Sequence, residues 1–224
     1  MQIFNCVKPS WFMGMDVSLE FLFAIITIMI AFFAYKAYKL VKQREVLFFS
    51  LAFLSISIAY LQQVIFNVAQ IYGLSSSSLA PIVGSVAYHL NLGFFVALIH
   101  IILFTIGLSI LVYLTIPKRN KKIFVVISGL SLIALITSFN IMFTSFLINS
   151  LLLMAITLNY YQLLNKKKTK SALYNYLGFG AIFLGQVQLA VVTQFSFFYV
   201  AGHIVTFLGY ILLLLNLYDV IKNR

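Results

Sequence analysis

Long apolar stretches, separated by short polar or basic segments, follow one another along the whole chain. A helix needs about 20 mostly apolar residues to cross a hydrocarbon core about 30 Å thick. The stretches that meet this requirement are 17–38, 46–71, 90–116, 122–139, 142–164, 172–193 and 197–219. The pattern predicts an all-α membrane bundle of seven transmembrane helices. It forms a single domain, 17–220, between an outer segment 1–16 and a tail 221–224.

The fourth and fifth stretches form one charge-free run from Ile123 to Asn165. This run is too long for a single span, and its one polar turn is Thr137-Ser138-Phe139-Asn140. We therefore expect two helices that meet at this turn, with a six-span bundle as the alternative.

The basic residues predict how the bundle is oriented. Fourteen of the 15 Lys and Arg residues follow the first, third, fifth or seventh stretch, and Lys8 is the exception. The loops on the other side, 72–88, 138–142 and 194–197, contain no Lys or Arg. Because positive residues stay on the cytoplasmic side, we expect the N-terminus outside and the C-terminus inside a cell membrane.

Composition narrows the class of protein further. The chain has 224 residues, of which 63% are hydrophobic and 8% charged, which is too little polar surface for a soluble domain. Its net charge of +11 resembles that of a nucleic-acid-binding protein, but the placement of the cations makes it an orientation signal. Cys6 is the only cysteine, which excludes an internal disulfide. The basic turns are expected to attract anionic lipids.

A few polar residues lie inside the apolar stretches, where they are costly and therefore candidates for function. We measured the depth of each along its helix from the Lys or Arg residues at the cytoplasmic end. At 1.5 Å per residue, six of them lie about 24–28 Å from those basic residues. These six are Glu20, Gln63, His100, Asn149, Gln186 and His203. In addition, Gln63, Asn67 and Gln70 share one helical face.

We predict a ligand pocket open to the outside at this level. Its expected residues are Glu20, Gln63, Asn67, Gln70, Asn149, Gln186 and His203. The alternative is that polar side chains near the membrane surface are tolerated without binding anything.

His100 and His203 share a depth on the third and seventh stretches, so a metal or haem iron between them is one interpretation. Hydrogen bonds to neighbouring helices are the other. Retinal is excluded, because no lysine lies between Phe197 and Asp219. No nucleophile elbow, P-loop or HExxH motif occurs, which disfavours an enzyme.

Two pairs of segments suggest an internal repeat. Leu61-Gln62-Gln63-Val64 resembles Leu184-Gly185-Gln186-Val187, 123 positions later, and the segments that begin at His100 and His203 resemble each other. Stretches one to three and five to seven would then be parallel repeats joined by the fourth, an arrangement known among transporters.

The segment Ala34–Tyr60, AYKAYKLVKQREVLFFSLAFLSISIAY, resembles small archaeal-type seven-helix membrane proteins that look like the membrane sensor regions of some histidine kinases. This resemblance implies sensing, although the chain has no kinase domain. We expect a receptor-like binding module that signals through a cytoplasmic partner protein. The alternatives are a small transporter or channel and a membrane haem or metal protein.

Overall fold

The computed structural model describes residues 10–71, 92–116, 121–191 and 196–222. A short 3₁₀ turn, η1 (Ser10–Phe12), leads into the helices. The helices are α1 (Met13–Val41), α2 (Arg44–Ile71), α5 (Leu92–Thr115), α6 (Lys121–Ile136), α7 (Ile141–Lys167), α8 (Lys170–Val191) and α9 (Ser196–Lys222). The described part is all-helical, as predicted.

Five of these helices, α1, α2, α5, α7 and α9, are long and apolar enough to cross a membrane. The chain is therefore a helical membrane protein surrounded by lipid. The predicted fourth span corresponds to α6, whose 16 residues reach about 24 Å, less than the hydrocarbon thickness. The predicted sixth span corresponds to α8, which is long enough but contains tyrosine, asparagine and glutamine residues that lower its hydropathy.

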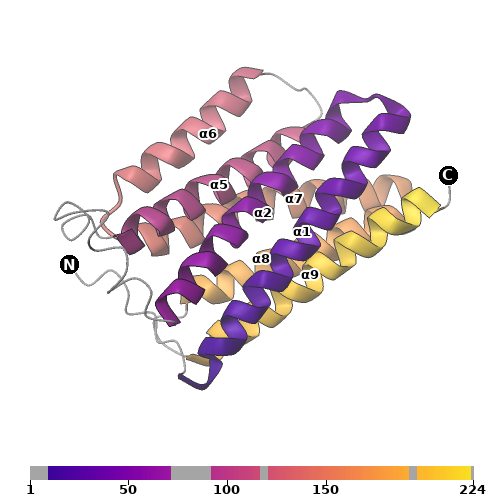
Figure 1. Cartoon of the computed structure of the whole chain (residues 1–224). Coiled ribbons are helices and arrows are strands. Elements are labelled where there is room, and N and C mark those ends of the chain that lie inside the picture. Colours follow the sequence, from indigo (N-terminus) through magenta and orange to yellow (C-terminus); the bar gives the residue numbers. More distant parts are fainter. Residues whose placement is uncertain (1–9, 72–91, 117–120, 192–195, 223–224) are drawn as a thin grey trace.

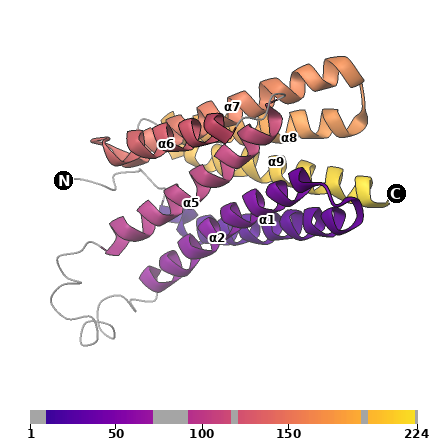
Figure 2. The same ribbon diagram turned by 90° about the horizontal axis from the view of Figure 1, so that it is seen from above.

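The packing of the described helices closes six of them into a ring. The remaining helix, α6, lies at the outer edge of the bundle (Figure 1). Around the ring, the order of packing is α1, α2, α5, α7, α8, α9 and back to α1. The view from above shows α6 to α8 on one side and α1 and α2 on the other (Figure 2). Because α6 crosses back outside the ring, α5 and α7 run parallel as neighbours.

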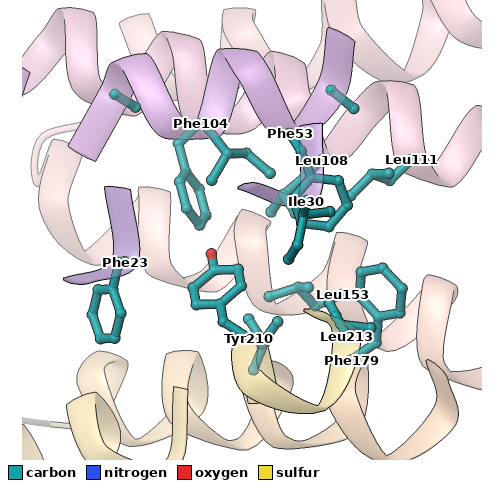
Figure 3. Packing of buried hydrophobic residues seen from close by; sticks show 14 of the residues in the cluster. Phe23, Ile30, Phe53, Phe104, Leu108, Leu111, Leu153, Phe179, Tyr210 and Leu213 are labelled. Carbon is teal, nitrogen blue, oxygen red and sulfur yellow. The ribbon is translucent and has the colours of Figure 1, made fainter. Parts of the chain in front are cut away.

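The apolar core fills the inside of the ring (Figure 3). Ile30, Phe53, Leu108, Leu153 and Phe179 come from five different helices and are almost completely buried. The side chain of Tyr210 extends from α9 into this space, with its hydroxyl pointing away from its own helix (Figure 3). In the described part of the chain, α6 contributes no fully buried residue to this cluster.

Two hairpins in the ring have the same turn. The α1–α2 turn and the α7–α8 turn are each two residues long, and each begins with a lysine in the left-handed conformation, Lys42 or Lys168. Each lysine N–H donates to the carbonyl four residues before it. The two lysines lie 126 positions apart, and the helices that follow begin 126 positions apart as well.

A glycine contact also occurs at the equivalent place in both halves of the chain. A Cβ on Gly107 would lie 2.8 Å from the Ala52 carbonyl oxygen and 2.7 Å from Ile56. A Cβ on Gly209 would lie 2.7 Å from both the Gly178 carbonyl oxygen and Ile182, which follow Ala52 and Ile56 by 126 positions. For α2 and α8, the matching turns and contacts thus give an offset of 126 in place of the 123 of the sequence match, whereas the equivalent glycines of α5 and α9 are 102 positions apart.

We call α1, α2 and α5 the first half and α7, α8 and α9 the second half. Within the first half, serines of α2 donate hydrogen bonds to the backbones of neighbouring helices, as Ser57 Oγ does to the Ala24 carbonyl oxygen at 3.0 Å. Between the halves, four described polar contacts join side chain to side chain. They are Asp16–His203, Tyr60–Tyr210, Thr105–Asn149 and Asn159–Thr115.

Candidate functional site

The first turns of α1 bring two carboxylates into the bundle. Asp16 and Glu20 are four residues apart, so they lie on the same face of the helix. Asp16 is only 2% exposed and Glu20 only 8%. Asp16 lies in the first turn of α1, where the helix dipole favours a negative charge. Buried carboxylates of this kind require partners.

The partners of Glu20 come from α2. Asn67 donates through Nδ2 to Glu20 Oε2 at 2.6 Å, and Gln63 donates through Nε2 to Asn67 Oδ1 at 3.4 Å. Gln63 and Asn67 are one turn apart, which lets the two amides follow one another along the same face of α2. Gln63 and Asn67 of the predicted polar stripe are therefore linked to the carboxylate of Glu20 on α1.

Asp16 contacts His203 on α9. Its Nε2 lies 3.2 Å from Asp16 Oδ1, and its Nδ1 lies 2.9 Å from the Tyr199 carbonyl oxygen. Aromatic rings enclose the imidazole: Phe23 stacks against it, and Phe12 meets it edge-on. Three helices thus build one site, which we call the polar cluster and which consists of Asp16, Glu20, Gln63, Asn67 and His203.

Deeper in the bundle, aromatic residues pack next to the polar cluster. The hydroxyls of Tyr60 and Tyr210 lie 3.2 Å apart, and Phe23 packs against both rings. Both tyrosines are buried. A hydroxyl pair in an apolar surrounding is stable because each group satisfies the other. This layer separates the polar cluster from the apolar core.

The two histidines that were candidate metal or haem ligands have different partners. His100 Nδ1 lies 2.9 Å from the Ala59 carbonyl oxygen, and its ring stacks on Phe104. The rings of Phe23 and Tyr60 lie along the path from His203 to His100. Among the described residues, no group of three His, Cys, Asp or Glu side chains is placed to hold a metal ion.

For the other predicted pocket residues, the structure describes a different partner, burial alone, or nothing of the side chain. Asn149 is buried on α7 and accepts a hydrogen bond from Thr105 on α5, at 3.1 Å. Gln186 is buried on α8, and no described contact joins it to the polar cluster. The side chain of Gln70 lies outside the described residues. The described contacts thus join Glu20, Gln63, Asn67 and His203 to the polar cluster, and place Asn149 against α5.

Sequence reasoning missed Asp16. The apolar stretch begins at 17, which left Asp16 in the outer segment, whereas α1 begins at Met13 and buries this aspartate. One signal was available: two of the four acidic residues of the chain, Asp16 and Glu20, have helical i, i+4 spacing.

Comparison with known protein families, with curated proteins and with solved structures found no match. The groups that the polar cluster contains indicate its chemistry. It combines two carboxylates, two amides and an imidazole, which offer both acceptors and donors to a small polar molecule.

Proposed function

We propose that the protein is a receptor-like binding module of the cell membrane, which binds a small polar solute at the polar cluster. The observation that supports this most is the Gln63–Asn67–Glu20 chain of hydrogen bonds beside the Asp16–His203 pair. Buried polar groups from three helices are costly in a membrane protein and typically mark a site of function.

The positive-inside rule supports an orientation in which seven helices cross the membrane with the N-terminus outside. The polar cluster then lies near the outer surface, where an extracellular solute reaches it. The basic turns at Lys42 and Lys168 lie on the cytoplasmic side. We propose that they contact anionic lipids and a cytoplasmic signalling partner.

The test is a thermal-unfolding screen of the purified protein in lipid nanodiscs. The probes are amino acids, short amines and small sugars, which differ in their hydrogen-bond donors. We expect at least one class to raise the unfolding temperature of the wild type, because a ligand stabilises the state that binds it. The same solute should give no increase with Glu20→Gln or Asn67→Leu.

Asn216→Leu provides the matched control. Asn216 Nδ2 donates to Asn175 Oδ1 at 2.8 Å, and Asn216 lies about 20 Å along α9 from His203. Its loss should weaken the fold without changing the ligand-induced increase. A solute that stabilises the wild type and the Glu20 and Asn67 variants equally would contradict the proposed site.

A small transporter is the second candidate, and the matching hairpins favour it. Parallel repeats that move against each other around a site are a common plan of transporters. Here four described polar side-chain pairs join the two halves, and the Asp16–His203 contact of the polar cluster is one of them. Such contacts can separate without breaking either half.

A cross-link distinguishes transport from binding alone. In a Cys6→Ser background, Thr105→Cys and Asn149→Cys place two thiols across the boundary between the halves. If the protein transports, oxidation should stop uptake of the solute into proteoliposomes, and reduction should restore it. The control pair Asn175→Cys and Asn216→Cys links two helices of one half and should leave uptake unchanged. Binding without any uptake would support the receptor instead.

A further inference from the structure

The two halves of the ring meet along two seams, and the matching of the halves makes these seams equivalent. One seam lies between α1 and α9, and the other lies between α5 and α7. The turns at Lys42 and Lys168 relate α1 to α7 by 126 positions, and the contacts of Gly107 and Gly209 relate α5 to α9 by 102 positions. A residue pair in one seam can therefore be compared with the pair at the same place in the other.

The middle of the two seams differs in chemistry. In the α5/α7 seam, Thr105 Oγ1 donates a hydrogen bond to Asn149 Oδ1 at 3.1 Å. The same places in the α1/α9 seam are occupied by Phe207 and Phe23, whose ring centroids lie 6.3 Å apart. One seam is thus joined there by a hydrogen bond, and the other by a contact between aromatic rings.

The seams differ again toward the C-terminal ends of these helices. Asn159 Nδ2 of α7 donates to Thr115 Oγ1 of α5 at 3.2 Å. The equivalent residues of α1 and α9 are Phe33 and Leu217, whose side chains have neither a donor nor an acceptor. The α5/α7 seam therefore has a second hydrogen bond at a place where the side chains of the α1/α9 seam can form none.

In a membrane, this difference affects how easily each seam opens. Apolar surfaces that separate there meet lipid tails, which are as apolar as leucine, so mainly packing is lost. A hydrogen bond that breaks inside the bundle leaves a donor and an acceptor in hydrocarbon, which is costly. The polar contact between α1 and α9, Asp16–His203, lies at the end of its seam, in the first turn of α1. We therefore expect the α1/α9 seam to open more easily.

The helix α6 strengthens the same seam that the hydrogen bonds join. It packs against both α5 and α7 and connects them along the chain. Figure 1 shows α6 along α5, with α1 and α9 at the opposite edge of the bundle. Among the described helices, none packs across the outside of α1 and α9 in this way. The two halves are thus braced at one seam and unbraced at the other.

We propose that the bundle opens at the α1/α9 seam, with the α5/α7 seam as the hinge, and that a solute reaches the polar cluster through this opening. Opening separates Asp16 of α1 from His203 of α9, both of which are buried in the closed bundle. The entry of the solute rests on the proposed binding at the polar cluster, whereas the movement of the seam does not. Transport would require the α5/α7 seam to open as well.

Pulsed electron paramagnetic resonance measures both seams in the full chain, in lipid nanodiscs without solute. In a Cys6→Ser background, one variant carries spin labels at Leu22→Cys of α1 and Ile204→Cys of α9. The matched control carries them at Ile99→Cys of α5 and Leu147→Cys of α7, and all four positions are exposed. We expect two distances across the α1/α9 seam and one narrow distance across the α5/α7 seam. One narrow distance across α1/α9, or two distances across α5/α7, would overturn the proposal.

A reversible cross-link in the same two variants tests the entry of the solute. A bis-methanethiosulfonate reagent joins the two cysteines, and reduction releases them. With the α1/α9 seam cross-linked, the solute that stabilises the wild type should no longer raise the unfolding temperature, and reduction should restore the increase. The cross-link across the α5/α7 seam should leave the increase unchanged. An increase that survives the α1/α9 cross-link would overturn the entry route. If no solute stabilises the wild type, the proposed binding fails, and the spin-label distances still decide whether the seam opens.

Discussion

At Gly209, the backbones of α8 and α9 come too close together for a methyl group. An added Cβ would lie 2.7 Å from the Gly178 carbonyl oxygen, which belongs to the backbone and cannot rotate away. Gly185 and Gly202 lie in the same interface and face similar crowding. Small residues at such positions are the common way for membrane helices to pack closely.

We therefore predict that Gly209→Ala lowers the free energy of unfolding by about 1–3 kcal/mol, the usual cost of overpacking. Gly129→Ala on α6 is the control, because a Cβ there meets nothing within 4 Å. Since alanine favours a helix, this control should be neutral or more stable by up to about 1 kcal/mol. Unfolding in mixed micelles measures both, and equal stability of the two variants would contradict the close packing of α8 and α9.

The break between α6 and α7 depends on a helix cap. Asn140 precedes α7, and its Oδ1 accepts a hydrogen bond from the Phe143 N–H at 3.1 Å. Asparagine is among the preferred capping residues because it satisfies an N–H that has no partner within the helix. The predicted turn 137–140 is confirmed, with α6 ending at Ile136 and α7 beginning at Ile141.

Asn140→Ala should weaken the start of α7 by about 1 kcal/mol, the typical loss when a cap is removed. Hydrogen exchange of the Phe143 amide should become faster, whereas exchange in the middle of α7 should change little. Asn140→Ser retains a capping oxygen and should restore slow exchange. Unchanged exchange in Asn140→Ala would show that the hydrogen bond does not hold this end of α7.

At the scale of the whole molecule, the position of α6 determines the direction in which the second half runs relative to the first. Because α6 lies outside the ring and returns the chain to the starting side, both halves run in the same direction through the bundle. The same labelling experiment can test whether the 16 residues of α6 cross the bilayer and which end of the bundle faces the cytoplasm. The turn after α6 and the turn after α7 lie at opposite ends of the ring (Figure 1).

We predict that an impermeant maleimide labels Phe139→Cys from outside intact cells in a Cys6→Ser background. Phe139 is fully exposed in the turn between α6 and α7. Lys168→Cys, in the basic turn between α7 and α8, should be labelled only after the cells are permeabilised. The reverse result would invert the proposed orientation, and labelling of both sites from outside would exclude a complete crossing by α7.

The sequence by itself determined the class of protein and most of its helices. Apolar stretches and basic turns are local properties of the chain, so they predicted the all-helical membrane fold and the turn at 137–140. The amide stripe of Gln63 and Asn67 was also visible, because it follows from helical periodicity alone.

Only the tertiary structure decided which polar residues meet. Depth along a helix is read from the sequence, but the direction that a side chain faces depends on helix packing. Asn149 therefore pairs with Thr105, whereas Glu20 meets Asn67. Asp16 lies in the first turn of α1, and its role appears only when α9 brings His203 beside it. The burial of that pair between the two halves is set by how α1 and α9 pack, which neither helix determines alone.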